Sequence, residues 1–560
     1  MQIGNRAFLK ILLANLLYWM QEETMSLKVR PPWPMPAETA DVGKGLLKEE
    51  SPYKLVGDQL FYKIREQDFA DLYSIEGKPG ISPVILAFVS VFQFMEKLPD
   101  RQAAEAMRMR MDWKYALHLP LKYEGFDFSV LSEFRDRLLK HDAEGWVFDT
   151  LVNEFREMGL IKERGKQRSD SMAMLSKVRK LSRLEMMIET LRLAVGAIVR
   201  ADRAWGEMLI PPSWEEMYGE RFVMQRYSEQ EWRKYEERIG SDGQWLLERL
   251  EGENAPAKIR DLPEVQVLKT VWAQQFRESE GKIAYQELKR YDGHTQIQTP
   301  HDPEARYGKK RYQEWLGAKV QLTETDDEDR PHLITDITVT NSARTDYEEL
   351  ADIQERLAER NCLPASHYAD SGYLSGSNLA NSQAQGIDLI GPLAPVITPQ
   401  DRLPDGITWE QFEIDLQNGR ATCPGGHSIE KSWQNERVIR FKFPDKTCQE
   451  CSLCPRCCTG KGGRTLGVSP FYEHLRVARA RQETDEFKQD YHKHRSGVEG
   501  SLSALLRGNG LRVSRYVGQR KRCLQAVFIG CSANLQRVAR WQAGLRPQSR
   551  NSGWGLTPAN

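Results

Sequence analysis

The sequence predicts a mixed α/β protein, in which a sheet-containing core is interrupted by insertions and preceded by a small all-helical domain. Two observations lead to this prediction. Apolar residues recur at helical spacing within residues 58–145, whereas residues 317–340 alternate between apolar and polar side chains as strands do. Long segments without strand character separate the predicted strands, so distant parts of the chain must assemble one core. With 560 residues, the chain is long enough for about two to four domains.

The predicted units follow one another along the chain. An N-terminal arm or linker covers 1–57, with Met25 as an alternative start, and the helical domain covers 58–145. The core combines 160–175, 300–390 and 475–543, a helical insertion covers 176–299, an insertion with a cysteine cluster covers 391–474, and a disordered tail covers 544–560.

The apolar stretch from Phe8 to Met20 is interrupted by Lys10 and Asn15. A membrane-spanning helix needs about 20 apolar residues, and this stretch is shorter. No small-residue cleavage site follows it, so it does not match a signal peptide. We therefore expect a cytoplasmic protein without a membrane partner.

Individual helices can be placed by their first residues. Ser82 and Pro83 stand where a helix begins, before the apolar run VILAFVSVFQFMEKL, which predicts a buried helix. Ser129 is the expected N-cap of a second helix. The stretch RSDSMAM, residues 168–174, predicts a short strand with Asp170 near its end and with Met172 and Met174 on the same side. The helical insertion shows no strand pattern.

Strand patterns return at residues 317–323 (GAKVQLT) and 333–340 (LITDITVT), and the polar turn between them predicts a hairpin. A helix follows, with Thr345 and Glu348 spaced as a capping box. After that helix, HYADSGY predicts a short strand that runs into a glycine turn and ends close to Asp370.

The composition excludes several classes of protein. Lys plus Arg and Asp plus Glu both total 79, so the formal net charge is +0, which excludes a uniformly basic histone-like binder and an acidic-tail protein. A local basic surface is still compatible with nucleic-acid binding. The mean hydropathy of −0.59 argues against a protein that spans the membrane several times. Nine cysteines are too few for a disulfide scaffold.

Three acidic residues stand in settings that suggest chemistry. Asp170 and Asp370 end candidate strands, which is where open α/β sheets bind ligands. Glu499 lies on a predicted helix whose residues Tyr491, Arg495 and Glu499 project from one side at spacings of four. Three such carboxylates can bind two Mg²⁺ ions, activate a water or a 3′-hydroxyl and stabilise the leaving oxygen of a phosphodiester. The alternative is a chance triple among many acids.

The C-terminal part is strongly basic. From Arg476 to Arg540 there are 14 Lys and Arg against 5 Asp and Glu, a net charge of +9. Glycines and Tyr516 are interleaved, which favours contact with phosphates over a merely solvated helix face. The candidate DNA contacts here are Tyr491, Arg495, Arg507, Arg512, Arg515 and Lys521. A second basic group precedes the strand at 317–323 and comprises Arg306, Lys309 and Lys310; a solvated turn explains it equally well.

Six of the nine cysteines fall between residues 423 and 458. Because C-x₂-C is a metal-ligand spacing, Cys423, Cys448, Cys451 and Cys457 predict a tetrahedral structural Zn²⁺ site. Cys454, Cys458 and His427 are alternative ligands, and reduced thiols without metal are the other interpretation. The remaining cysteines, Cys362, Cys523 and Cys531, stand alone and are expected in the core.

Taken together, these motifs resemble those of a DDE transposase of a bacterial insertion sequence. The resembling pieces are FYKIREQDF, SVLSEFRDRL, RSDS, DPEARYGKK, WLGAK, YADSGYLS, the cysteine cluster and YHKHRSGVEGSLSALLRGNGLRVSRYVGQRK. The resemblance is to the large type, with an InsH-like helical N-terminal domain and an RNase H-like core. It implies that Asp170, Asp370 and Glu499 are the first, second and third catalytic carboxylates.

The resemblance further implies two Mg²⁺ (or Mn²⁺) ions and double-stranded DNA as partner, at both transposon ends and target. It also implies a homodimer or larger assembly on DNA and a place at the bacterial nucleoid. We expect the helical N-terminal domain to bind DNA; dimerisation and a purely structural helical bundle are the alternatives. In the signature Y-x₂-R-x₃-E-x₆-K of related transposases, Arg495 and Glu499 keep their spacing. Tyr491 stands one residue too far upstream, and His492 is in the tyrosine position. Leu506 is in the lysine position, with Arg507 next to it. Two other hypotheses are a transposase-derived DNA-binding protein without catalysis and a metal-dependent nuclease on the same fold.

Overall fold

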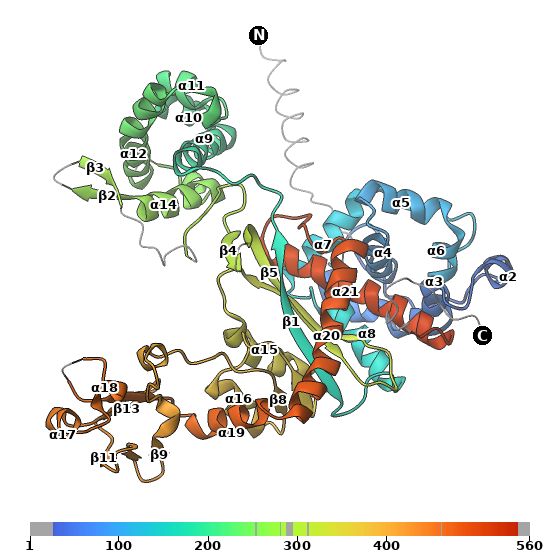
Figure 1. Ribbon diagram of the computed structural model, residues 1–560. Coiled ribbons are helices and arrows are strands. Elements are labelled where there is room, and N and C mark those ends of the chain that lie inside the picture. Colours follow the sequence, from blue (N-terminus) through green and yellow to red (C-terminus); the bar gives the residue numbers. More distant parts are fainter. Residues whose placement is uncertain are drawn as a thin grey trace.

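The computed structural model describes residues 26–74, 76–252, 255–279, 282–286, 295–310, 313–460 and 462–546. It confirms the predicted fold class, a mixed α/β core with a helical N-terminal region. Figure 1 shows the N-terminal helices on one side of the central sheet, whereas the helical insertion and the cysteine-rich insertion project on the other. The stretch from Phe8 to Met20 and the end of the predicted tail lie outside the described residues.

The N-terminal region is a cluster of helices around one apolar core. Its main helices are α2 (Ala37–Leu46), α3 (Pro52–Leu55), α4 (Pro83–Met95), α5 (Asp100–Met109), α6 (Met111–Ala116), α7 (Ser129–Lys140) and α8 (Trp146–Glu157), with short π and 3₁₀ turns at Val56–Leu60, Phe61–Lys63 and Glu66–Leu72. Every residue of α4 is buried, as its uninterrupted apolar run predicts. Among the described residues, no helix combines the length and the apolar character that crossing a membrane requires.

Two local predictions for this region are wrong. The expected linker 26–57 contains α2 and α3, and Tyr53, Leu55 and Val56 are buried in the domain core. Two of its prolines stand at helix starts, since Pro36 precedes α2 and Pro52 is the first residue of α3. Ser129 is the first residue of α7 and not its N-cap; the carboxylate of Asp127 accepts the hydrogen bond from its backbone N–H at 2.9 Å.

The central sheet has six described strands. They are β1 (Lys166–Leu175), β4 (Arg306–Lys310), β5 (Gln313–Thr325), β6 (Ile334–Asn341), β7 (Ser366–Tyr368) and β8 (Asp388–Ile390). Their order is β4-β5-β1-β7-β8, and β6 also pairs with β5. The predicted hairpin is confirmed by the antiparallel pairing of β5 with β6. Because β1 pairs in parallel with β7, these two strands run to the same edge of the sheet.

One strand differs from its prediction in a way that matters for the site. β1 continues to Leu175, so Asp170 lies in its middle, opposite Leu322 of β5, and not at its end. The pairing with β5 extends over nine residue pairs and carries the strand past the polar residues that seemed to end it. Asp370, in contrast, follows the last residue of β7 by two positions, as predicted.

Helices cover this sheet and join it to the N-terminal region. α15 (Asp346–Glu359) packs on β6, and α16 (Gly376–Ala384) packs on β8. α19 (Tyr472–Gln482) leads into α20 (Asp485–Gly508), which packs on β1. α21 (Gln519–Gln542) packs on β6 and also on α4 and α8, so the same helix belongs to the sheet and to the helical core. The predicted capping box is present, with Glu348 accepting from the backbone N–H of Thr345 at 2.9 Å.

The helical insertion contains α9 (Arg183–Ala201), α10 (Arg203–Leu209), α11 (Ser213–Tyr218), α12 (Glu229–Glu251), α13 (Ala257–Arg260) and α14 (Pro263–Gln275). The prediction that this unit has no strands is wrong, because β2 (Phe276–Ser279) and β3 (Lys282–Tyr285) form a hairpin. Tertiary contacts explain it: the rings of Phe276 and Tyr285 stack at 5.1 Å, and Phe276 and Ile283 pack against Gly240 of α12.

The cysteine-rich insertion is built from very short elements. They are β9 (Glu413–Asp415), β10 (Arg420–Thr422), β11 (Ser428–Glu430), β12 (Trp433–Gln434), β13 (Ile439–Lys442), α17 (Asp445–Gln449), α18 (Cys454–Cys457) and β14 (Thr465–Val468). The strands form two separate three-stranded sheets, β11-β10-β9 and β12-β13-β14.

Candidate active site

Asp170 and Asp370 come from the neighbouring parallel strands β1 and β7 and share one environment. Asp170 is buried, its Oδ2 pairs with Nη2 of Arg495 at 2.7 Å, and its Oδ1 accepts from the backbone N–H of Ser171 at 2.7 Å. Asp370 accepts from the backbone N–H of Gly372 at 2.9 Å. Burial and then the charge of Asp170 raise the pKa of the Asp370 carboxyl. The two carboxylates are therefore close enough to repel each other.

A third aspartate, Asp346, lies beside them and was missed in the sequence. A Cβ on Gly372 would lie 3.0 Å from Oδ1 of Asp370 and 3.3 Å from Oδ2 of Asp346. The oxygens of Asp346 already have partners, since they accept from Ser171, Lys319 and Gln321 at 3.1 Å each. Asp346 therefore organises the polar surroundings of Asp370. The only signal in the sequence was its place after the N-cap Thr345.

α20 supplies Tyr491 and Arg495 to this environment. Tyr491 donates to the backbone oxygen of Ala369 at 3.2 Å, one residue before Asp370. Burial raises the pKa of Tyr491 to about 12, with smaller contributions from Asp370 and Asp170. His492, which occupies the tyrosine position of the signature, is exposed. A helix presents residues three and four positions apart on the same face, so the shifted spacing still brings Tyr491 to the aspartates.

Glu499 lies on α20 one turn beyond Arg495, and its side chain is exposed. Within the part of the chain that the structure describes, it makes no hydrogen bond or ion pair, whereas Arg495 contacts Asp170 directly. In that same part, no three or more Asp, Glu, His or Cys side chains have an arrangement that could hold a metal ion. The structure thus brings Asp170 and Asp370 together and leaves Glu499 on the adjoining helix face.

A buried network of charges fixes α20 on the sheet. We call Arg168, Glu324, Asp326 and His494 the α20 anchor. Arg168 of β1 donates to Glu324 at 2.8 Å, to Asp326 at 2.6 Å and to the backbone oxygen of His494 at 2.9 Å. Nδ1 of His494 lies 2.7 Å from Asp326. Burial alone would raise the pKa of Glu324, but Arg537 and Arg168 hold it below its usual range.

The anchor needs a glycine on α20. A Cβ added to Gly497 would lie 2.2 Å from Nη1 of Arg168, whereas a Cβ at Gly500 would meet nothing within 4 Å. Arg168 and Asp170 are two positions apart on β1 and so share one face of the strand. The anchor therefore sets the position of α20 directly beside Asp170, and with it the position of Arg495.

Besides Tyr491 and Arg495, the predicted DNA contacts fall into two groups. Arg507 and Arg512 are exposed, as are Lys309 and Lys310, although Lys309 pairs with Glu314 at 3.3 Å. The charge of Lys310 offsets part of the rise in the pKa of Asp370, so Lys310 is near enough to act on this carboxylate. Lys521 pairs with Asp136 at 2.9 Å.

The other two are turned toward the protein. Arg306 donates to the backbone oxygens of Pro303 and Ala305. Arg515 donates to the backbone oxygen of Leu98 at 2.8 Å, and its guanidinium lies 4.6 Å from the ring centroid of Phe94. For Arg515 the structure favours a role in joining the core to the N-terminal helices.

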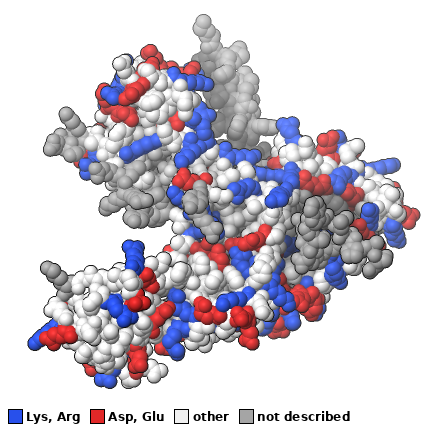
Figure 2. Space-filling model, viewed as in Figure 1, with Lys and Arg blue, Asp and Glu red and all other residues white. Residues whose placement is uncertain are grey.

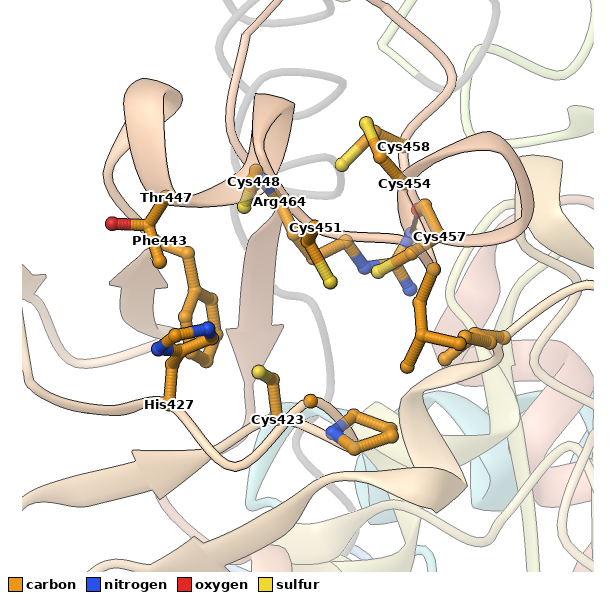
Figure 3. A pocket seen from close by; sticks show the side chains of 14 residues that line it. Cys423, His427, Phe443, Thr447, Cys448, Cys451, Cys454, Cys457, Cys458 and Arg464 are labelled. Carbon is orange, nitrogen blue, oxygen red and sulfur yellow. Dashed lines mark hydrogen bonds between the residues drawn. The ribbon is translucent and has the colours of Figure 1, made fainter.

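The cysteine cluster surrounds a small cavity between the β10–β11 turn and the α17–α18 segment (Figure 3). Cys423 and His427 come from the turn, and the other five cysteines come from the α17–α18 segment. Figure 3 shows the sulfur atoms of Cys423, Cys448, Cys451 and Cys457 facing this space, with Cys454 and Cys458 next to each other at its far side. Of the isolated cysteines, Cys362 and Cys531 are buried and Cys523 is half-buried.

Figure 2 shows that the surface is hollowed between the helical insertion and the cysteine-rich insertion. β4 and α15 lie between these insertions in Figure 1. These are the elements that end at Lys310 and begin at Asp346, the neighbours of Asp370.

Two parts of the chain match known protein families. Residues 422–539 match a family described as a transposase DDE domain, and residues 44–137 match a transposase domain, DUF772. The first match includes the cysteine cluster, Tyr491, Arg495 and Glu499, and the second lies in the helical N-terminal region. No curated protein and no solved structure matches the chain. The two matches, which lie in the order that the resemblance implies, support a DDE transposase of an insertion element.

Proposed function

We propose that this transposase cleaves DNA strands at the ends of its element and joins them to target DNA. Asp170, Asp370 and Glu499 are the proposed metal-binding carboxylates. The single observation that carries the proposal is the meeting of Asp170 and Asp370 beside Arg495, on adjacent strands and a helix far apart in the sequence. Carboxylate oxygens are the ligands that Mg²⁺ prefers. The mutual repulsion of the two aspartates is what a divalent cation would relieve.

Bound Mg²⁺ would activate a water or a 3′-hydroxyl and stabilise the leaving oxygen of the phosphodiester. Two aspartates hold only part of its coordination sphere. Glu499 is exposed on the face of α20 that carries Arg495, so it can complete the site from the helix side by a change of side-chain rotamer or a small movement of α20.

Arg495 is suited to hold the scissile phosphate. Its side chain is buried, yet its Nε and Nη1 have no hydrogen-bond partner among the residues that the structure describes. Unpaired buried donors are costly, and a guanidinium recognises phosphate oxygens through several N–H groups at once. With Nη2 on Asp170, the free edge would fix a phosphate beside the aspartates.

We place the DNA in the hollow between the two insertions, because β4 and α15 lie there and carry Lys310 and Asp346 close to Asp370. Lys310 would neutralise a second phosphate at this entrance. Since two ends of an element must be cut, we further propose that at least two copies of the chain act together on DNA.

The test uses the purified full chain, Mg²⁺ and DNA carrying the inverted repeats that flank its reading frame. Asp370→Ala should lower strand cleavage roughly a thousandfold, because loss of a metal ligand removes several kcal/mol of transition-state stabilisation at about 1.4 kcal/mol per tenfold. Asp388→Asn is the matched control, since Asp388 lies on the next strand, β8, and pairs at the surface with Arg481. It should keep the wild-type rate.

Each alternative gives a different result. Cleavage without dependence on the repeats and without joined product would identify a nuclease. DNA binding without any metal-dependent cleavage would identify a DNA-binding protein that has lost catalysis. An unchanged rate in Asp370→Ala would remove Asp370 from the metal site.

A further inference from the structure

The cysteine-rich insertion has little apolar material to hold it together. Among the described residues its core consists of nine buried apolar side chains, and its strands are two to four residues long. Sheets this short are marginal on their own, and small units usually need a disulfide or a metal in addition. All nine cysteines are free thiols, so no disulfide supplies this stabilisation.

The thiols lie on two separate segments of the insertion, the β10–β11 turn and the α17–α18 segment, so a shared ligand would join them. The β10–β11 turn carries Cys423, while Cys448 lies one residue before the end of α17 and Cys457 ends α18. A Cβ on Gly425 would lie 3.3 Å from the sulfur of Cys451 and 3.6 Å from that of Cys423, so sulfur atoms from both sides approach one point. The cavity they line has a volume of about 30 Å³, which suits a single small occupant.

Two hydrogen-bond donors of Arg464 lie beside the cavity and can stabilise negative charge there. The backbone N–H of Arg464 points at the sulfur of Cys448 at 3.4 Å, a contact of the kind that orients and stabilises metal-bound thiolates. The guanidinium of Arg464 is buried against the cavity, and its Nε has no hydrogen-bond partner among the described residues. A buried cation without a full set of partners points to an anionic group nearby.

We propose that Cys423, Cys448, Cys451 and Cys457 bind one Zn²⁺ ion that clamps the β10–β11 turn to the α17–α18 segment. Four thiolates close the tetrahedral shell and leave no position for substrate, so the ion is structural. The four thiol protons go to solvent, and Arg464 offsets part of the net double negative charge of the site. Cys454 and Cys458 lie next to each other at the far side of the cavity (Figure 3), so they are left out of the shell.

In the described residues the sulfur atoms do not yet have ligand geometry, so the turn and the α17–α18 segment draw together when the ion binds. Metal binding and the final packing of the insertion are then one process. This inference is independent of the proposed catalytic function, because it concerns ligands that no reacting atom touches.

The experiment measures metal content in the purified full chain, and no activity assay is needed. Elemental analysis should find about one zinc per chain. Replacing zinc by Co²⁺ should give the strong thiolate-to-metal charge-transfer absorption and the visible bands of a tetrahedral four-sulfur site. The double variant Cys448→Ser with Cys451→Ser should lose the metal.

The matched control is the double variant Cys454→Ser with Cys458→Ser, which should keep both the zinc and the cobalt spectrum. Folded wild-type protein without zinc, or disulfides between these cysteines found by mass spectrometry of alkylated protein, would overturn the proposal. Loss of metal from the Cys454 and Cys458 variant would overturn the proposed ligand set. Should Cys448→Ser with Cys451→Ser fail to fold, the cobalt spectra of the wild type and the control still decide.

Discussion

The α20 anchor and the cysteine-rich insertion both bring separate segments of the chain together, but with different kinds of side chain. In the anchor, Arg168 faces the carboxylates of Glu324 and Asp326, and Asp326 also contacts His494. In the insertion, thiols and one buried arginine surround a cavity. The charged network is completed by the polypeptide alone, whereas the thiol cluster is completed by the ion that we propose.

A second contrast lies between the two insertions. Among the described residues, the helical insertion buries twenty apolar side chains in its own core, and the cysteine-rich insertion buries nine. At roughly 1.5–3 kcal/mol for each fully buried large side chain, the helical insertion can offset the entropy of ordering its chain much better. The difference teaches where the protein depends on something besides packing: the helical insertion is held by its core, and the cysteine-rich insertion by its proposed metal.

The largest expected effect is therefore the local unfolding of one insertion when metal is removed. Structural zinc contributes about 10 kcal/mol or more to small zinc domains, which exceeds what nine buried side chains leave after ordering. Limited proteolysis compares the full chain with and without a zinc chelator, and Mg²⁺ is left out of both samples. The chelator should expose new cleavage sites within 391–474. Sites within 176–299 should stay protected, and added Zn²⁺ should restore the original pattern. If the chelator exposed new cleavage sites equally in both insertions, the two insertions would not differ in their dependence on metal.

The next effect comes from breaking the α20 anchor sterically. Gly497→Ala places a Cβ against the guanidinium of Arg168, so either Arg168 or α20 must shift. Overpacking of this kind costs roughly 1–3 kcal/mol, and a displacement of about 1 Å at a catalytic helix can reduce the rate about a hundredfold. Thermal unfolding and cleavage of repeat-bearing DNA measure the two consequences.

Gly500→Ala is the matched control on the same helix, because its Cβ would meet nothing within 4 Å. It should leave cleavage unchanged and stabilise the protein by roughly 0.5–1 kcal/mol, since alanine is the better helix former. If both variants unfold at the same temperature and cleave equally well, the anchor does not set the position of α20.

The sequence was sufficient to predict some parts of the fold but not others. Local patterns were sufficient for the fold class, for the β5–β6 hairpin and for α4, because alternation, capping residues and apolar runs act over a few residues. The place of Asp170 within β1 was not predictable, since its pairing with β5 joins residues about 150 positions apart. The prediction that 26–57 is a linker failed for a similar reason. Its helices are stabilised by contacts with a distant part of the chain, in the core that buries Tyr53 and Leu55.

For the candidate site, the motifs pointed to Asp170, Asp370 and Glu499, and the structure brings the first two together. The residues that surround them belong to no motif. Asp346 and the α20 anchor could not be predicted, because they depend on close tertiary contacts. These contacts are made at Gly372 and Gly497, where two elements approach each other closely. Likewise, composition predicted a basic C-terminal surface but could not tell an exposed arginine from one that bonds inward.

The smallest expected effect separates those two kinds of arginine. Arg512 is exposed, and its backbone oxygen accepts from Leu175 at the end of β1, so its side chain is held close to the sheet while remaining accessible. Arg512→Ala should weaken DNA binding severalfold and reduce the slope of log affinity against log salt by about 1, as expected for the loss of one phosphate contact. Binding titrations at several salt concentrations measure both quantities.

Arg515→Ala should behave differently, because Arg515 bonds to Leu98 and stacks on Phe94 of the N-terminal helices. Losing a charged hydrogen bond and a cation–π contact costs roughly 2 kcal/mol of stability, so its unfolding temperature should fall while its salt dependence stays that of the wild type. A changed salt slope in Arg515→Ala with unchanged stability would mean that the basic segment releases this side chain to DNA. In that case the junction between α21 and α4 would open on binding, and the N-terminal helices would move relative to the sheet.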